Sequence, residues 1–223
     1  MDRRDPLRGS RDDKTNNFET MTASDSIDFA KGGGLVPAII QDADTQQVLM
    51  LGYMNEEALA ATRASGKVTF FSRSKERLWT KGETSGNEFA LVDVTPDCDN
   101  DALLVRVRPK GPACHRGTPS CFGDSGATGP GFLAHLDGVV AGRLANPDTE
   151  SSYTARLAAK GRSRVAQKVG EEGVEAALAG VGGSNEELTG EAADLLYHLI
   201  VLLRVRGLKL ADAIAVLEKR HAK

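Results

Sequence analysis

The chain has 223 residues, a length that fits one large domain or two small ones, since domains commonly run about 100–150 residues. A hydrophobic share of 40% and a charged share of 26% describe an ordinary soluble globular protein. The net charge of −3 disfavours non-specific nucleic-acid binding, and no apolar run reaches the roughly 18 residues that a membrane helix needs. Aromatic residues make up only 5% of the chain, so each domain buries little area and subunit association is expected.

The N-terminal segment has no apolar stretch of a signal peptide. Residues 1–20 carry five basic and five acidic side chains and few apolar ones, so we expect 1–27 to be a disordered tail and Met21 to be a candidate true start. The odd count of three cysteines, without an export signal, predicts the reducing cytosol. There the thiolates serve metal binding or chemistry rather than disulfides.

Short β-rich runs alternate with turns in the first half of the chain. They predict strands over 36–41, 47–51, 67–72, 89–94 and 103–108. One helix interrupts them, with Asn55 as its N-cap, acidic residues in its first turn and Gly66 beyond its end. Residues 123–131 contain four Gly, one Pro and no apolar periodicity, which predicts a linker.

After this linker the pattern is helical almost throughout. It predicts helices over 132–144, 152–159, 161–180, 184–206 and 209–221. Ser184 and Glu187 have the spacing of a capping box at the start of the fourth helix, and Gly207 ends it. The predicted fold is therefore a β-rich α+β domain over 28–122, followed by an all-α domain over 132–223.

Three cysteines, Cys98, Cys114 and Cys121, follow the spacing C-x15-C-x6-C. Structural zinc sites usually have closely paired cysteines and four protein ligands, whereas three ligands and an open position are typical of catalytic zinc. Such a zinc lowers the pKa of bound water to about 7. His115 could be a fourth ligand or a general base. The spacing alone leaves open the alternative of three unrelated buried cysteines.

An acidic run surrounds the first of these cysteines. In an extended chain Asp97, Asp99 and Asp101 point to one side and Cys98 to the other. Neighbouring carboxylates repel one another unless a cation neutralises them, and Mg²⁺ suits an all-oxygen site. A solvated acidic turn is the alternative, but the nearby thiols favour the metal.

A Gly-, Ser- and Thr-rich segment over 79–87 offers an ammonium, hydroxyls, an amide and glycine N–H groups that can approach an anion closely. This chemistry predicts a phosphate cradle with an aromatic side chain beside it for a base or sugar, although most such segments are simply loops. The candidate substrate-binding residues are Trp79, Lys81, Gly82, Glu83, Thr84, Ser85 and Asn87.

Residues 28–122 resemble phosphoribosyl-AMP cyclohydrolase. The motifs that carry the resemblance are 34–42, 48–56, 79–87, 97–101, Cys114-His115 and Cys121. The resemblance implies a homodimer with zinc near the subunit interface, held by Cys98, Cys114 and Cys121, one of these thiolates coming from the partner chain. It also implies Mg²⁺ on Asp97, Asp99 and Asp101. The implied reaction is attack of zinc-activated hydroxide on C6, which opens the N1–C6 bond of the adenine ring without loss of ammonia.

In the second half, Glu172 and Glu175 are spaced i,i+3, and Glu191 and Asp194 repeat that spacing. A short connection makes the two helices antiparallel neighbours, which can bring all four carboxylates together. Apolar neighbours place Asp194 near a packed interface, where like charges are costly without a cation. Mg²⁺ resolves that conflict and assists phosphoanhydride hydrolysis. A solvated acidic face is the alternative.

Basic residues precede this cluster, and Lys168, one turn before Glu172, is predicted to bind a triphosphate. Residues 152–154, 168–175 and 191–194 resemble phosphoribosyl-ATP pyrophosphohydrolase, and the match spans about 132–221. It implies Mg²⁺ on the four carboxylates and attack of water on the triphosphate, which releases pyrophosphate. Relatives with other nucleotide substrates share the carboxylate motif. The fusion decides the substrate, because the product of this half is the substrate of the other.

Two other functions fit parts of the sequence. One is a zinc nucleotide deaminase fused to a general nucleotide pyrophosphohydrolase, but the H-x-E and P-C-x-x-C motifs usual in deaminases are not present. The other is a non-catalytic zinc module with a helical dimerisation tail. The sequence favours a bifunctional hydrolase of histidine biosynthesis that acts on phosphoribosyl-ATP and then on phosphoribosyl-AMP.

Overall fold

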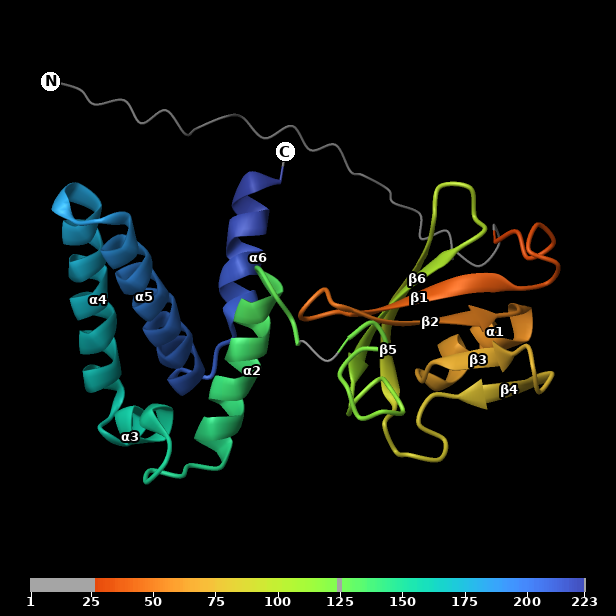
Figure 1. Ribbon diagram of the computed structural model, residues 1–223, viewed down its shortest axis with the longest axis horizontal. Coiled ribbons are helices and arrows are strands. Elements are labelled where there is room, and N and C mark those ends of the chain that lie inside the picture. The colour runs from red at the N-terminus through yellow and green to blue at the C-terminus, as the bar shows by residue number, and fades with distance from the viewer. Residues whose placement is uncertain (1–26, 124–125, 223) are drawn as a thin grey trace, which may run out of the picture.

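The computed structural model describes residues 27–123 and 126–222, so the predicted tail up to residue 26, with Met21, lies outside the described residues. A strand-rich part and a helical part follow each other along the chain (Figure 1). Each has a hydrophobic core of its own. The predicted fold class, α+β and then all-α, is confirmed.

Four strands form the main sheet, in the order β2-β1-β6-β5. They are β1 (Val36–Asp42), β2 (Val48–Met54), β5 (Phe89–Pro96) and β6 (Leu103–Pro109). β6 runs parallel to β1, and the β1–β2 and β5–β6 pairs are antiparallel. β2 and β5 are therefore the two edges of the sheet, separated by three strand spacings.

Side chains alternate between the two faces of β1, as the period of a strand requires. Val36, Ala38 and Ile40 are fully buried in the core, whereas Ile39 is 37% exposed. Ile39 pairs with Leu51 on one side and Leu104 on the other. The outer face of the sheet therefore carries an apolar row across three strands.

The inner face is covered by α1 (Glu56–Ser65) and by a hairpin of β3 (Thr69–Ser72) and β4 (Arg77–Thr80). The caps of α1 are as predicted, since the Asn55 side chain accepts from the Ala58 N–H and Gly66 is left-handed. β4 was not predicted, because its four residues show no alternation of polar and apolar side chains. It forms through pairing with β3, where Trp79 lies opposite Phe70 with ring centroids 4.9 Å apart.

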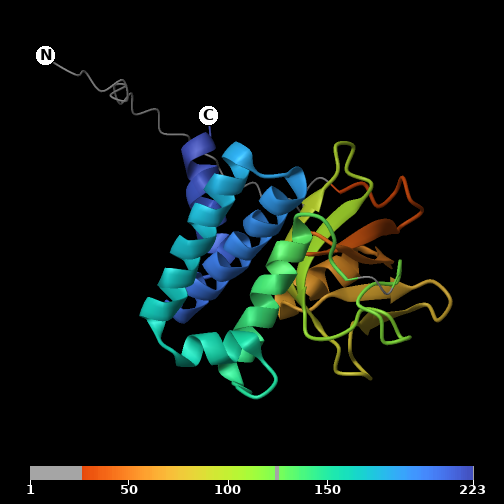
Figure 2. The same ribbon diagram turned by 60° about the vertical axis from the view of Figure 1, so that its left-hand side comes forward.

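The helical part consists of α2 (Gly131–Ala145), α3 (Tyr153–Ala159), α4 (Arg162–Gly182), α5 (Asn185–Val205) and α6 (Leu210–His221). These bounds differ from the predicted ones by only one or two residues, and the capping box of Ser184 and Glu187 is confirmed. α4 and α5 form an antiparallel hairpin (Figure 1 and Figure 2). None of the described helices is long and apolar enough to cross a membrane.

A buried ion pair joins two of these helices. Both carboxylate oxygens of Asp137 on α2 accept from the Arg204 guanidinium on α5, at 2.6 Å each. Bidentate pairs of this kind fix geometry as well as charge. The pair holds the α4–α5 hairpin, which carries the acidic residues, against the rest of the helical core.

Candidate active sites

Two of the three thiols lie beside each other, on a segment that runs from the end of β6 to the edge strand β2. The Cys121 N–H donates to the Leu49 carbonyl at 2.8 Å, and the Ser120 hydroxyl donates to the Val48 carbonyl at 2.8 Å. These bonds attach the segment to β2 and bring Cys121 to the buried Cys114. The thiol pair is therefore a feature of tertiary structure that the spacing could not reveal.

The two thiols differ in acidity. The backbone N–H of Arg116 donates to Cys114 Sγ at 3.5 Å and lowers the pKa of that thiol, while burial raises the pKa of Cys121. His115 is exposed, and its Nδ1 lies 3.9 Å from Cys114 Sγ. Two adjacent thiols with an imidazole beside them suit a thiophilic, borderline-soft cation such as Zn²⁺.

Lys81 faces this thiol pair. Its side chain is only 9% exposed, its Nζ lies 4.9 Å from the centroid of the Phe89 ring, and burial lowers its pKa against the opposing effect of the two thiols. The sequence predicted Lys81 as part of a phosphate cradle. In the folded chain its ammonium interacts electrostatically with Cys114 and Cys121, so it can neutralise thiolate or substrate charge.

Cys98 does not join the pair. Among the residues that the structure describes, Cys114 and Cys121 have no third cysteine, histidine or carboxylate that completes a group within 4.8 Å. Cys98 is exposed in the turn after β5, at the other edge of the sheet from β2. With strands spaced about 4.8 Å, those edges are roughly 14 Å apart. A single chain therefore does not gather all three predicted zinc ligands.

Asp97, Asp99 and Asp101 do lie together, with oxygens within 4.8 Å of one another. The prediction that an extended chain aligns them was wrong, because the segment is a turn with Asn100 at φ 61°. The Asp97 carboxylate closes this turn by accepting from the Asp101 and Ala102 N–H groups, at 3.0 and 3.1 Å. Oxygen donors so close together fit Mg²⁺.

A lysine ammonium is bound to this acidic turn. Lys31 Nζ lies 2.5 Å from Asp99 and 2.6 Å from Asp101, and it lowers the pKa of Asp99. The loop that carries Lys31 is itself tied to the turn, since the Asp28 N–H donates to the Asn100 carbonyl at 2.8 Å. The carboxylates of this turn therefore bind a positive charge, which in this structure is the Lys31 ammonium.

The predicted phosphate cradle is an ordered loop between β4 and β5. Gly82 and Gly86 have positive φ, and a Cβ at Gly82 would lie 2.6 Å from the Glu88 nitrogen. Glu83 pairs with Arg77 at 2.8 Å and accepts from the Thr80 N–H, which lowers its pKa. The remaining predicted residues, Thr84, Ser85 and Asn87, follow on the same loop, and Thr84 and Ser85 are exposed.

In the helical part, three of the four predicted carboxylates gather. Oxygens of Glu172, Glu175 and Glu191 lie within 4.8 Å of one another across α4 and α5. Glu172 is only 5% exposed, and burial together with the charges of Glu172 and Glu191 raises the pKa of Glu175. Like charges held this close in a partly buried place suit a divalent cation.

Asp194 lies outside that group and is exposed. Its expected position near a packed interface was wrong for the single chain, because the apolar side chains around it include Leu196, which also faces solvent. Asp194 remains one turn from Glu191 on the same face of α5.

Lys168 and the unpredicted His198 contact the buried carboxylate. Lys168 Nζ lies 2.6 Å from Glu172, and His198 Nδ1 lies 3.6 Å from it. His198 Nδ1 is 2.9 Å from the Asp194 carbonyl, which can only accept, so this nitrogen donates, and Nε2 lies 3.2 Å from the Tyr153 hydroxyl. The only sequence signal for His198 was a histidine inside an apolar helical run.

Comparisons with known proteins agree with this division. Residues 50–123 match the phosphoribosyl-AMP cyclohydrolase family, and residues 135–221 match the phosphoribosyl-ATP pyrophosphohydrolase family. The chain is 60% identical over 200 residues to the histidine biosynthesis bifunctional protein HisIE of Xanthomonas campestris pv. campestris, which covers 89% of this chain and 95% of that protein.

Proteins of the same name are similar in other bacteria. The Escherichia coli K12 protein is 57% identical over 195 residues, covering 87% of this chain and 95% of its own length. The Vibrio parahaemolyticus protein is 54% identical over 205 residues, covering 91% and 97%. The chain belongs to the family of bifunctional histidine-biosynthesis enzymes that join a phosphoribosyl-AMP cyclohydrolase to a phosphoribosyl-ATP pyrophosphohydrolase.

Proposed function

We propose that the chain catalyses two consecutive hydrolyses in histidine biosynthesis, each at a metal site built from its own half. The helical part converts phosphoribosyl-ATP to phosphoribosyl-AMP and pyrophosphate. The strand-rich part then opens the adenine ring of phosphoribosyl-AMP. Family membership of both halves supports the two reactions. The observation that carries the metal assignment is the separate gathering of metal-ligating atoms in each half.

In the helical part, Glu172, Glu175 and Glu191 would hold Mg²⁺, and Asp194, one turn from Glu191 on α5, would complete the set. Mg²⁺ supplies charge neutralisation of the phosphate oxygens and orientation of water. The Lys168 ammonium lies 2.6 Å from Glu172 and, with that carboxylate engaged by a metal, would be free to bind the triphosphate. His198 and Tyr153 hold this end of the cluster in place.

In the strand-rich part, Zn²⁺ is held by Cys98, Cys114 and Cys121. Zinc lowers the pKa of water to about 7 and so supplies the nucleophile for C6 of the adenine ring. His115, beside Cys114, acts as the general base of ring opening. The buried Lys81 balances negative charge at the same place. A site of free thiolates needs a reducing compartment, which supports residence in the cytosol.

The acidic turn of Asp97, Asp99 and Asp101 holds Mg²⁺ in the same half. The Lys31 ammonium, which neutralises two of these carboxylates, would move away to admit the ion. Asp97 and Asp99 flank Cys98 in the sequence, so this Mg²⁺ site and the third zinc ligand belong to the same turn. Substrate phosphate is the natural further ligand for Mg²⁺ held by few carboxylates.

The working unit is a homodimer in which Cys98 of one chain meets the thiol pair of the other. Two features support this. Cys98 is exposed and lies at the opposite edge of the sheet from Cys114 and Cys121. The outer face of the sheet also exposes apolar side chains, Ile39 at 37%, Val48 at 40% and Leu51 at 44%, as a dimer interface requires.

Mixing two inactive variants tests this arrangement. Cys98→Ser and Cys114→Ser should each lose ring opening as pure proteins. In a mixed dimer, the Cys114 and Cys121 of one chain meet the intact Cys98 of the other, so one of its two sites is complete. Random exchange of subunits should therefore restore about a quarter of the wild-type rate, since half of the dimers are mixed.

The measurement is ring-opened product formed from phosphoribosyl-AMP, after the two variants are unfolded and refolded together with zinc. Mixing each variant with itself is the control. No recovery in the mixture, with wild-type protein refolding fully under the same treatment, would mean that the zinc ligands come from one chain.

A further inference from the structure

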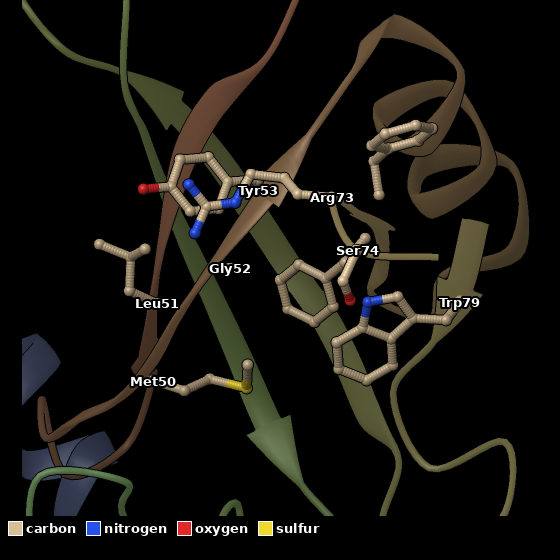
Figure 3. A pocket seen from close by; sticks show the side chains of 9 residues that line it. Met50, Leu51, Gly52, Tyr53, Arg73, Ser74 and Trp79 are labelled. Atoms are coloured by element: carbon tan, nitrogen blue, oxygen red, sulfur yellow. The ribbon is translucent and has the colours of Figure 1, made fainter. Parts of the chain in front are cut away.

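A pocket of about 550 Å³ opens between the edge strand β2 and the β3–β4 hairpin (Figure 3). This volume is in the range of small-molecule sites, about 300–1,000 Å³. The lining combines aromatic and aliphatic walls with a guanidinium, a hydroxyl and an indole N–H. It consists of Met50, Leu51, Gly52, Tyr53, Phe70, Phe71, Arg73, Ser74 and Trp79, of which only Trp79 was predicted to bind substrate.

Arg73 supplies the charge of this pocket. Its guanidinium lies 3.8 Å from the centroid of the Tyr53 ring, and Figure 3 shows it stacked over that ring at the pocket wall. Within 27–123 and 126–222, no carboxylate forms an ion pair with Arg73, whereas Arg77 on the same hairpin pairs with Glu83 at 2.8 Å. No acidic residue lines the pocket either. A stacked guanidinium without a counter-ion suits a phosphate.

The pocket adjoins the thiol pair along two strands. On β2, Met50 lines the pocket, and its neighbour Leu49 accepts the hydrogen bond from the Cys121 N–H. On the hairpin, Trp79 lines the pocket, and Lys81, two residues on, faces the same thiols. A nucleotide with its adenine at the thiols can therefore extend an arm into the pocket.

The substrate of the proposed ring opening needs two anion sites, because phosphoribosyl-AMP carries a ribose 5-phosphate arm on each side of its adenine ring. The loop over 82–87 offers one such site. We infer that the pocket of Arg73 and Trp79 binds the other ribose 5-phosphate arm, with Arg73 and Ser74 on its phosphate and Tyr53 and Trp79 against its sugar. This inference rests on the proposed function and adds a second phosphate site to it.

The chain has a single tryptophan, so all tryptophan fluorescence comes from Trp79, which lines this pocket. The probes are AMP, ribose 5-phosphate and adenosine, titrated into full-length protein with excitation at the red edge of the tryptophan band. Wild-type protein should respond to AMP and ribose 5-phosphate. Arg73→Met should weaken both by about tenfold or more, because it removes a charge-assisted bond, and should leave adenosine binding unchanged. Lys75→Met is the matched control, since it removes a positive charge two residues away, outside the pocket lining.

Turnover gives a second readout. Arg73→Met should raise the KM for phosphoribosyl-AMP by about tenfold or more while Lys75→Met leaves it unchanged. The inference is overturned if the two variants weaken AMP equally, or if wild-type protein opens the ring and Arg73→Met keeps its KM. If wild-type protein opens no ring although AMP changes the Trp79 fluorescence, the proposed function fails and the phosphate pocket stands.

Discussion

Replacing Cys114 with serine should lower the rate of ring opening by more than about 10³-fold, because a site that cannot hold zinc leaves water near its ordinary pKa. Pyrophosphate release from phosphoribosyl-ATP should stay close to wild type, since its carboxylates lie on α4 and α5 in the helical part. Phosphoribosyl-AMP should then accumulate. Chromatography of the nucleotides after incubation with phosphoribosyl-ATP and Mg²⁺ measures both reactions at once.

The helical half is the internal control of that experiment. A variant that loses both activities would indicate general misfolding or one shared site. A lowered temperature of thermal unfolding would indicate misfolding, and an unchanged one would indicate a shared site. A Cys114→Ser variant that opens the ring at the wild-type rate would remove this thiol from the metal site. Zinc content per chain, measured in the same preparation, should fall together with ring opening.

Replacing Glu175 with glutamine should have the opposite outcome, a loss of pyrophosphate release by about 10²-fold or more with ring opening of added phosphoribosyl-AMP retained. Burial and the charges of Glu172 and Glu191 raise the pKa of Glu175. Its ionised form is therefore unfavourable in the free protein, and a bound cation would stabilise it. The neutral amide keeps the shape of the side chain and removes that charge. Mn²⁺ binding, followed by electron paramagnetic resonance, should weaken with it.

Glu186→Gln is the matched control for this variant. It makes the same chemical change on α5, at an exposed position in the first helical turn and outside the carboxylate group. It should release pyrophosphate at close to the wild-type rate. A Glu175→Gln protein with a full rate of pyrophosphate release and unchanged Mn²⁺ affinity would remove Glu175 from the metal shell.

The features that could be predicted from sequence are those that depend on local spacing. A helical period places Glu172 and Glu175 on one face, and the short connection between α4 and α5 makes the two helices antiparallel neighbours. For this reason both helices and the grouping with Glu191 follow from the residues alone. The caps of α1 and α5 are equally local.

Features that depend on distant segments could not be predicted. The meeting of Cys114 with Cys121 requires a return of the chain to β2, and the separation of Cys98 depends on the order of the strands. The extended geometry considered for Asp97, Asp99 and Asp101 was wrong because β5 ends at Pro96 and the chain then turns, with Asn100 at φ 61°. The charge interaction of Lys81 with Cys114 and Cys121 likewise joins segments that are distant in sequence.

The pocket of Arg73 depends on the same kind of long-range contact. It forms only where β2 meets the hairpin, and Gly52 allows that approach because a Cβ there would lie 2.4 Å from the Phe70 ring. β4, which brings Trp79 to the pocket, has no sequence pattern of its own. Binding sites that form between distant elements therefore leave the weakest signal in this sequence.

Incubating full-length protein with phosphoribosyl-ATP and Mg²⁺, before and after removal of zinc, tests the central claim that the two halves of the chain use separate metal sites. With zinc, pyrophosphate and ring-opened product should form in equal amounts. Without zinc, pyrophosphate release should continue while phosphoribosyl-AMP accumulates, and added zinc should restore ring opening. Undiminished ring opening in zinc-free protein, or loss of pyrophosphate release together with zinc, would contradict the account.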